Sequence, residues 1–117
     1  MNVWLLLPAL LWAHHGWQEF EEKKEITLSG VVTDFHFVNP HCVIEFEVKD
    51  GNGVGQTWQA EFASPAPMAK KGWTASTVGA GDPITVSGHP GKNGMKAVHA
   101  TKVKLANGQE YKLEAGR

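Results

Sequence analysis

The chain of 117 residues has little cysteine, no excess of charge of one sign and no apolar run long enough for a membrane span. Its one cysteine, Cys42, cannot form an internal disulfide, so a disulfide-stapled fold is excluded. Eleven basic and twelve acidic side chains give a formal net charge of −1, which provides no positive field to attract nucleic acid. We therefore expect no nucleic-acid partner, and a fold that depends on its hydrophobic core.

The longest apolar stretch lies at the N-terminus, in residues 3–13. It is shorter than the roughly 20 residues that span a bilayer, and it fits the roughly 7 to 15 of a signal-peptide core. We predict a signal peptide over residues 1–13 and a periplasmic or secreted mature protein that begins at His14, without stable membrane insertion after processing. Because Met1-Asn2 supplies no lysine or arginine, a buried N-terminal segment of a cytoplasmic domain is the alternative.

Thirteen glycines, six prolines and several short alternating runs are typical of a small all-β domain. Residues 42–48 alternate most clearly, with Cys42 on the inward side, which predicts a buried and unreactive thiol. In the preceding strand the apolar parity changes at Gly30, where we predict a β-bulge or a sharp coil. Ser64-Pro65 and Gly72 are typical of the two ends of a short helix. Further strands are predicted at residues 56–62, 84–88, 97–105 and 109–113.

This order of elements predicts an OB-like barrel of five to six strands, with one short helix between the third and fourth strands. An immunoglobulin-like sandwich ranks second, because it would need about seven strands and no helix at that point. We assign residues 25–117 to the barrel. Residues 14–24 form an N-terminal arm, whose Trp17 and Phe20 are predicted to pack onto it.

Histidine is the chemically informative residue type, since all six copies lie after the predicted cleavage site. A mature N-terminal His14 would offer its α-amine and imidazole Nδ1 to one metal ion. His41 begins a strand after the Asn39-Pro40 turn, where a folded-back arm can reach it, and His36 lies across that turn. We predict a metal site of His14, His15 and His41, with His36 as a possible fourth donor. Nitrogen donors without thiolate suit Cu(II), which we favour, or Zn(II).

Plainer interpretations of these histidines stay open. His14 and His15 can be a polar chain start, and His41 can cap its turn. His89 and His99 are predicted to be a loop residue and a strand-surface residue. We interpret Glu45 as a solvent-facing acid, and no motif of nucleophilic or phosphate chemistry supports an enzyme.

An ordered series of short motifs over nearly the whole mature chain resembles a family of small exported bacterial proteins of unknown function. The resemblance implies a periplasmic or secreted β-barrel and brings no established activity. The residues that carry it are His14-His15-Gly16-Trp17, Asn39-Pro40-His41, Ser64-Pro65, Lys71-Gly72-Trp73-Thr74, Gly81-Asp82-Pro83-Ile84-Thr85-Val86, Gly88-His89-Pro90 and Leu105-Ala106-Asn107-Gly108.

Two functions follow as hypotheses. The first is an exported metal-binding module, with copper favoured, that uses the N-terminal histidine. The second is a periplasmic module that binds a protein, peptide or small ligand without metal, using Trp17, Phe37 and Trp73 as an exposed aromatic surface.

Overall fold

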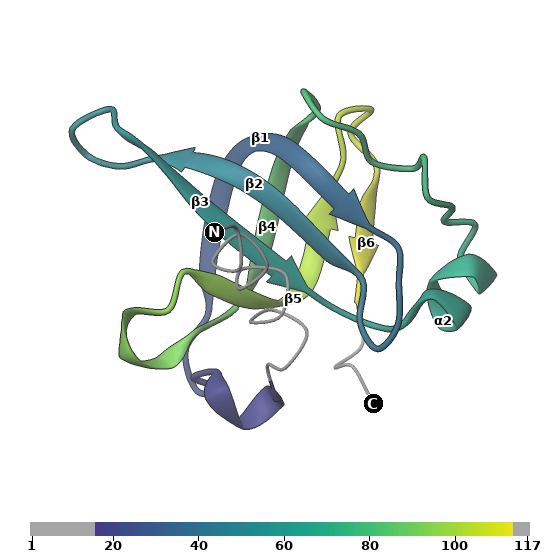
Figure 1. The fold of residues 1–117 in the computed structure, drawn as a ribbon, viewed down its shortest axis with the longest axis horizontal. Helices are drawn as coiled ribbons and strands as arrows, with labels where there is room; N and C mark the ends of the chain where they lie inside the picture. The colour runs from purple at the N-terminus through teal and green to yellow at the C-terminus, as the bar shows by residue number, and fades with distance from the viewer. Residues whose placement is uncertain (1–15, 114–117) are drawn as a thin grey trace, which may run out of the picture.

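The computed structural model describes residues 16–113, in which five strands close into a barrel (Figure 1). Neighbouring strands follow the order β3-β2-β1-β4-β5, and a parallel pairing of β3 with β5 completes the circle, while β6 pairs with β5 outside it. Helix α2 lies between β3 and β4 in the chain, so the predicted all-β, OB-like order is confirmed. The elements are β1 (Ile26–His36), β2 (Val43–Lys49), β3 (Gly55–Glu61), α2 (Pro65–Lys70), β4 (Pro83–Pro90), β5 (Ala97–Lys104) and β6 (Glu110–Lys112).

The bulge in β1 lies later than predicted. The pairing of β1 with β2 shifts between Val32 and Asp34, which leaves Thr33 as the extra residue. Gly30 serves a different purpose, because a Cβ there would lie 2.2 Å from the backbone oxygen of Glu47. A bulge at Gly30, one of the two alternatives predicted there, was therefore wrong, because close strand approach also favours glycine in a strand.

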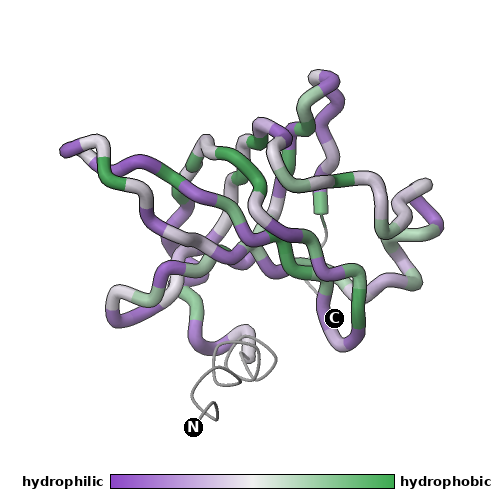
Figure 2. The backbone as a smooth tube through the Cα atoms, turned by 45° about the horizontal axis from the view of Figure 1, so that its top comes forward, coloured by the Kyte–Doolittle hydropathy of each residue, from purple (hydrophilic) through white to green (hydrophobic). Residues whose placement is uncertain are grey.

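Both faces of the barrel wall are covered at one end of β2. Cys42, Val43 and Ile44 are consecutive and all buried, but Val43 is not part of the central core cluster that contains the other two. Apolar and polar residues alternate along the strands in Figure 2, as expected when only one face of a strand packs inward. Something must therefore cover the outer face at Val43.

The N-terminal arm covers part of this outer face. Phe20 is 1% exposed and forms an isolated bridge with Gly91, and the backbone N–H of Glu21 donates to the carbonyl of Pro90 at 2.8 Å. Before Phe20 the chain makes a short 3₁₀ turn, Trp17–Glu19. The prediction that Phe20 and Trp17 pack onto the barrel is confirmed.

Trp73 closes one end of the core instead of forming a surface. It is 2% exposed, and its ring meets those of Phe35, Phe62 and Tyr111 at centroid distances of 5.3 to 5.9 Å. Phe37 is also partly buried against the core. The exposed aromatic surface of Trp17, Phe37 and Trp73 was therefore wrongly predicted.

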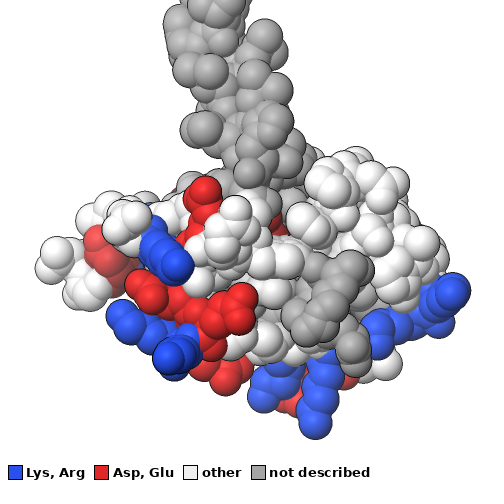
Figure 3. All heavy atoms as spheres, turned by 90° about the horizontal axis from the view of Figure 1, so that it is seen from below, with Lys and Arg blue, Asp and Glu red and all other residues white. Residues whose placement is uncertain are grey.

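Acidic and basic side chains are interspersed on the face that Figure 3 shows, in line with the balanced composition. Within residues 16–113, no helix is both long and apolar enough to cross a membrane.

Candidate metal centre

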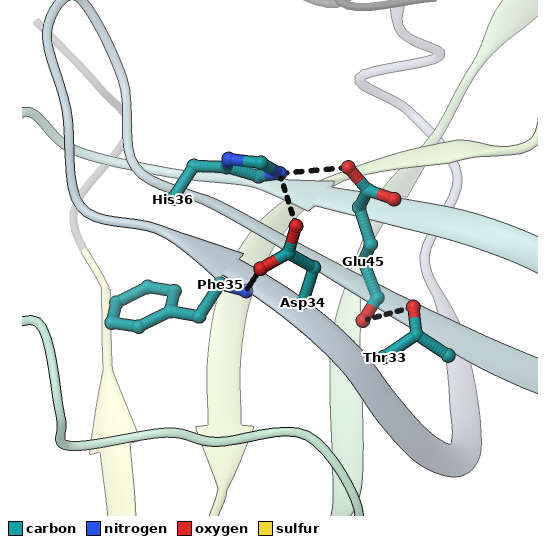
Figure 4. A network of polar contacts seen from close by, with 5 residues as sticks. All are labelled: Thr33, Asp34, Phe35, His36 and Glu45. Carbon is teal, nitrogen blue, oxygen red and sulfur yellow. Dashed lines mark hydrogen bonds and ion pairs between the residues drawn. The ribbon is translucent and has the colours of Figure 1, made fainter.

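Asp34, His36 and Glu45 bring three ligand-type side chains together on the outer face of β1 and β2 (Figure 4). One ligand atom from each lies within 4.8 Å of the other two. His36 Nε2 lies 2.7 Å from Glu45 Oε2 and 3.4 Å from Asp34 Oδ2. In the described part of the chain, this is the one group of three or more such residues with that spacing. We call it the carboxylate site.

The bulge at Thr33 builds this arrangement. It resets the register so that Asp34 lies opposite Glu45 and His36 lies opposite Val43. Residues two apart in a strand share a face, so Asp34 and His36 both flank Glu45. The Thr33 hydroxyl also donates to the backbone carbonyl of Glu45 at 3.2 Å, which ties the bulge to the neighbouring strand.

Local hydrogen bonds orient the two carboxylates. The backbone N–H of Phe35 donates to Asp34 Oδ1 at 2.9 Å, and the other oxygen of Asp34 is the one nearer His36. The N–H of His36 Nε2 donates to Glu45 Oε2 at 2.7 Å. A divalent ion can replace that proton, because imidazole nitrogen and carboxylate oxygen are both good ligands for Zn(II) and Cu(II).

The carboxylate site is open to solvent. The side chains of His36 and Glu45 are each 25% exposed, and that of Asp34 is 59% exposed. An ion held there would keep free coordination positions for water or another ligand. Glu45 was interpreted from sequence as a solvent-facing acid, and it does lie on the outer face, but no sequence pattern grouped it with Asp34 and His36.

The predicted ligand His41 lies in a different group. Its ring is 4.3 Å from that of Trp17, which also stacks on His99 at a centroid distance of 3.6 Å and an angle of 8°. Burial lowers the pKa of His41, which favours the neutral form that ligates metals. Among the described residues, His36 therefore belongs to the carboxylate site, and His41 belongs to the group around Trp17. His14 and His15 lie outside the described residues.

The sequence interpretation was wrong for His89 and His99. His89 belongs to β4 and not to a loop, and His99 is 3% exposed in β5 although it was expected on the strand surface. Glu61 on β3 was not singled out at all, yet it is fully buried. For His99 the alternation indicated the outer face, and the missing information was that Trp17 and Phe20 of the arm lie against its ring.

Cys42 has no role in either group. It is fully buried, and burial raises the pKa of its thiol to about 11. The predicted burial of this thiol is confirmed.

Comparisons with solved structures find the same fold in parts of larger proteins. The chain is 20% identical to a ZRD-deleted mutant of TiaS in complex with agmatine, with a TM-score of 0.56, and the match covers 83% of this chain but 28% of that one. For TiaS in a complex with a tRNA and ATP, the identity is 17% and the TM-score 0.48, over 74% and 19% of the two chains. The likeness to the first of these structures shows the fold alone. The chain spans less than a third of either protein.

Comparison with curated proteins returns no significant match. One family profile, described as a family of unknown function, DUF6152, matches residues 5–100. This agrees with the resemblance seen in the motifs, and the chain belongs to the DUF6152 family.

Proposed function

We propose that this protein is an exported metal-binding module, and that Asp34, His36 and Glu45 bind one divalent transition-metal ion. The observation that carries the proposal is the convergence of three ligand atoms within 4.8 Å on a solvent-open face. Hydrogen bonds from Phe35 and Thr33 support this arrangement from behind the ligands, as is usual around protein metal sites.

Copper(II) is the preferred ion of this proposal, and zinc(II) the second. Cu(II) binds a given set of nitrogen and oxygen ligands more tightly than the other first-row divalent ions. The open face also allows the tetragonal arrangement that Cu(II) favours, with water at the remaining positions. Zn(II) accepts the same imidazole and carboxylate ligands in tetrahedral geometry.

The N-terminal histidine remains part of the proposal as a sequence prediction. What supports it is the position of the described arm, because Trp17 contacts His41 at the Asn39-Pro40 turn. Export itself rests on the apolar segment at residues 3–13 and on the family resemblance.

The first experiment compares the mature protein with His36→Gln by calorimetric titration with Cu(II) and with Zn(II). Loss of a direct ligand should weaken binding at the carboxylate site by at least about 100-fold, since even supporting residues cost about 10- to 100-fold. Glu47→Gln is the matched control, because Glu47 is an exposed acid two residues along the same strand and outside the cluster. Equal affinity of His36→Gln and the unmodified protein would overturn the proposal.

A second experiment addresses the terminal histidine separately. One alanine added before His14 removes the free α-amine from the histidine and should weaken Cu(II) binding strongly if that chelate exists. Because amine and imidazole must be deprotonated, the affinity of the native form should also fall as pH drops. Unchanged affinity in the extended form would limit the proposal to the carboxylate site.

A further inference from the structure

A groove opens at the end of the barrel where β4 and β5 separate. The pairing of these two strands ends at Thr85 and Lys104. Strand β4 nevertheless begins earlier, at Pro83, where it pairs with β1. The chain after Lys104 turns toward β6, and this turn, the start of β4 and the bend of β1 lie together at the top of Figure 1. Two strands that part in this way leave a gap between their side chains.

The gap consists of two adjoining hollows. The first, of about 190 Å³, reaches down to the buried core residues Val32 and Val78. The second, of about 260 Å³, runs past Ser29 and Thr85. Together they fall in the lower part of the range of about 300 to 1,000 Å³ that is usual for small-ligand sites. We call the two hollows the end groove, and they share the wall residues Pro83, Ile84, Leu105 and Ala106.

The walls of the end groove come from sequence motifs that have no part in the carboxylate site. The segment 81–86 begins β4, and the segment 105–108 forms the turn between β5 and β6. They are far apart in the sequence, and neither contributes a residue to the carboxylate site. The fold thus brings two of the motifs that carry the family resemblance to one concave surface.

The end groove carries one charge of each sign. Asp82 lies in the first hollow and Lys104 in the second, and the other described wall residues are uncharged. The N–H of Gly79 donates to Asp82 Oδ2 at 3.0 Å, which orients the carboxylate and leaves Oδ1 for a ligand. Lys104 has Glu110 as its register partner on β6, but within residues 16–113 no ion pair joins them. A ligand with both a cation and an anion is complementary to these two ends.

The spacing of the two charges sets the length of that ligand. Thr85, the register partner of Lys104, lies three residues after Asp82, which corresponds to about 10 Å at the rise of a β-strand. An extended peptide advances by about 3.3 to 3.6 Å per residue, so the terminal ammonium and carboxylate of a tripeptide are separated by a similar distance. A single amino acid is too short to reach both charges.

The wall between the two charges suits a peptide. Ile84 and Leu105 provide an apolar surface for a central side chain. The hydroxyls of Ser29 and Thr85 bond to each other at 3.0 Å. Each hydroxyl has two acceptor positions and one donor, so the pair retains acceptors for the N–H groups of a peptide.

We propose that the end groove binds a short peptide of about three residues with free ends and an apolar central side chain. The peptide ammonium binds Asp82, its carboxylate binds Lys104, and its central side chain packs on Ile84 and Leu105. Capture of a free peptide end by charged and polar groups is a known mode of peptide recognition. The carboxylate site and the N-terminal arm take no part in this binding.

The experiment is a titration of the mature ¹⁵N-labelled protein with the tripeptide alanyl-leucyl-alanine, in the presence of a metal chelator. The backbone amide resonances of Ile84, Leu105 and Ala106 should shift together and saturate, with a dissociation constant of about 0.1 to 1 mM for so small and open a site. The amide of Gly51, in a remote turn, should not shift. No saturable shift up to about 10 mM peptide would overturn the proposal.

Blocked peptides test the role of the two ends. An acetylated N-terminus or an amidated C-terminus should each weaken binding by about 10-fold, because each removes a hydrogen-bonded charge pair that is partly open to solvent. Equal affinity for the free peptide and for the peptide blocked at both ends would overturn the assignment of Asp82 and Lys104.

Variants assign each end to its residue. Lys104→Gln should remove the preference for a free carboxylate and keep the preference for a free ammonium, and Asp82→Asn should do the reverse. The amide oxygen of asparagine still accepts from Gly79, so the fold should be retained. Lys102→Gln, an exposed lysine two residues earlier in β5 and outside the groove, is the matched control and should bind like the unmodified protein. Unchanged preferences in both groove variants would overturn the proposal.

The same titration separates this proposal from the metal site. His36→Gln should bind the tripeptide with the affinity of the unmodified protein, because His36 does not line the end groove. Lys104→Gln should in turn keep its affinity for Cu(II). Failure of the carboxylate site would therefore appear only in the metal titration, and failure of the end groove only in the peptide titration.

Discussion

The carboxylate site lies on the outer face of the barrel, and so do Glu61, His99 and His89, which we call the arm-covered row; the surroundings of the two groups differ. In the carboxylate site, His36 and Glu45 are a quarter exposed and lie on two neighbouring strands. In the arm-covered row, Glu61 and His99 are sealed, and Trp17 and Phe20 lie close to His99. The comparison shows that polar side chains on the outer face of one barrel are left open to solvent at β1 and β2 and are buried where Trp17 and Phe20 pack beside His99.

We expect the largest effect on stability when the N-terminal arm no longer packs on the barrel. Phe20→Ala removes a ring that is 1% exposed and should destabilise the protein by about 3 to 5 kcal/mol in urea denaturation, as other buried Phe→Ala changes do. The arm-covered row should then become as accessible as the carboxylate site. Val54→Ala, at a site 55% exposed, should change stability by less than about 0.5 kcal/mol. A Phe20→Ala cost as small as that of Val54→Ala would show that the arm is not held by this ring.

Gly88→Ala tests the backbone on which the row is built. A Cβ at Gly88 would lie 2.2 Å from the backbone oxygen of His99 and 2.7 Å from a Val98 methyl. The strands β4 and β5 would have to separate, and we expect a loss of about 1 to 3 kcal/mol together with weaker Trp17 packing, seen as a change in tryptophan fluorescence. Gly51→Ala, where nothing lies within 4 Å, is the control and should be nearly neutral. Equal stability of Gly88→Ala and Gly51→Ala would contradict the close approach of β4 and β5 at Gly88.

Much of the barrel could be predicted because its signals are local. Alternation in residues 42–48 identified the inward Cys42, Ile44 and Phe46, and Ser64-Pro65 with Gly72 marked the helix ends. Gly72 indeed has a positive φ of 93°. Each of these signals depends on a few neighbouring residues, and closing the barrel required only the order of the elements.

The sites could be predicted only in part, because they depend on register and on coverage. His36 was a predicted candidate and lies in the observed cluster. Its neighbours Asp34 and Glu45 depend on a one-residue bulge at Thr33, whereas the sequence indicated a bulge or a sharp coil at Gly30. His99 and Glu61 are outward by parity, and no local pattern reveals that both are buried or that Trp17 and Phe20 lie beside His99. A one-residue shift in register reverses every face, which is why a bulge limits prediction so strongly.

Thr33→Val tests the carboxylate site alone. The change removes the hydroxyl that donates to the Glu45 carbonyl and leaves the shape of the side chain almost unchanged. Metal affinity at the carboxylate site should fall about 10-fold, the lower end of the effect of supporting residues. Thr85→Val removes a comparable hydroxyl that bonds Ser29 away from the site, and its affinity should match that of the unmodified protein. If Thr33→Val and Thr85→Val bind the metal ion with equal affinity, the Thr33 hydroxyl does not support the site.

The smallest expected effect is a change in how stability depends on pH at His41, beside the arm. It is measured in metal-free protein with chelator present. Burial lowers the pKa of His41 below its ordinary value of 6.5, so the unfolded chain binds more protons than the folded one as pH falls past 6.5. Stability should therefore decrease from about pH 7 to about pH 5, and His41→Gln should make that slope shallower in denaturant titrations at several pH values. Asp50 provides the contrast, because backbone hydrogen bonds from Val54 and Asn52 lower its pKa below 3.8. Its contribution is present above that value and is lost only in stronger acid, so Asp50→Asn should leave the window between about pH 5 and pH 7 unchanged. If stability falls with pH as steeply in His41→Gln as in the unmodified protein, then burial of the neutral His41 ring beside Trp17 is not the cause of that fall.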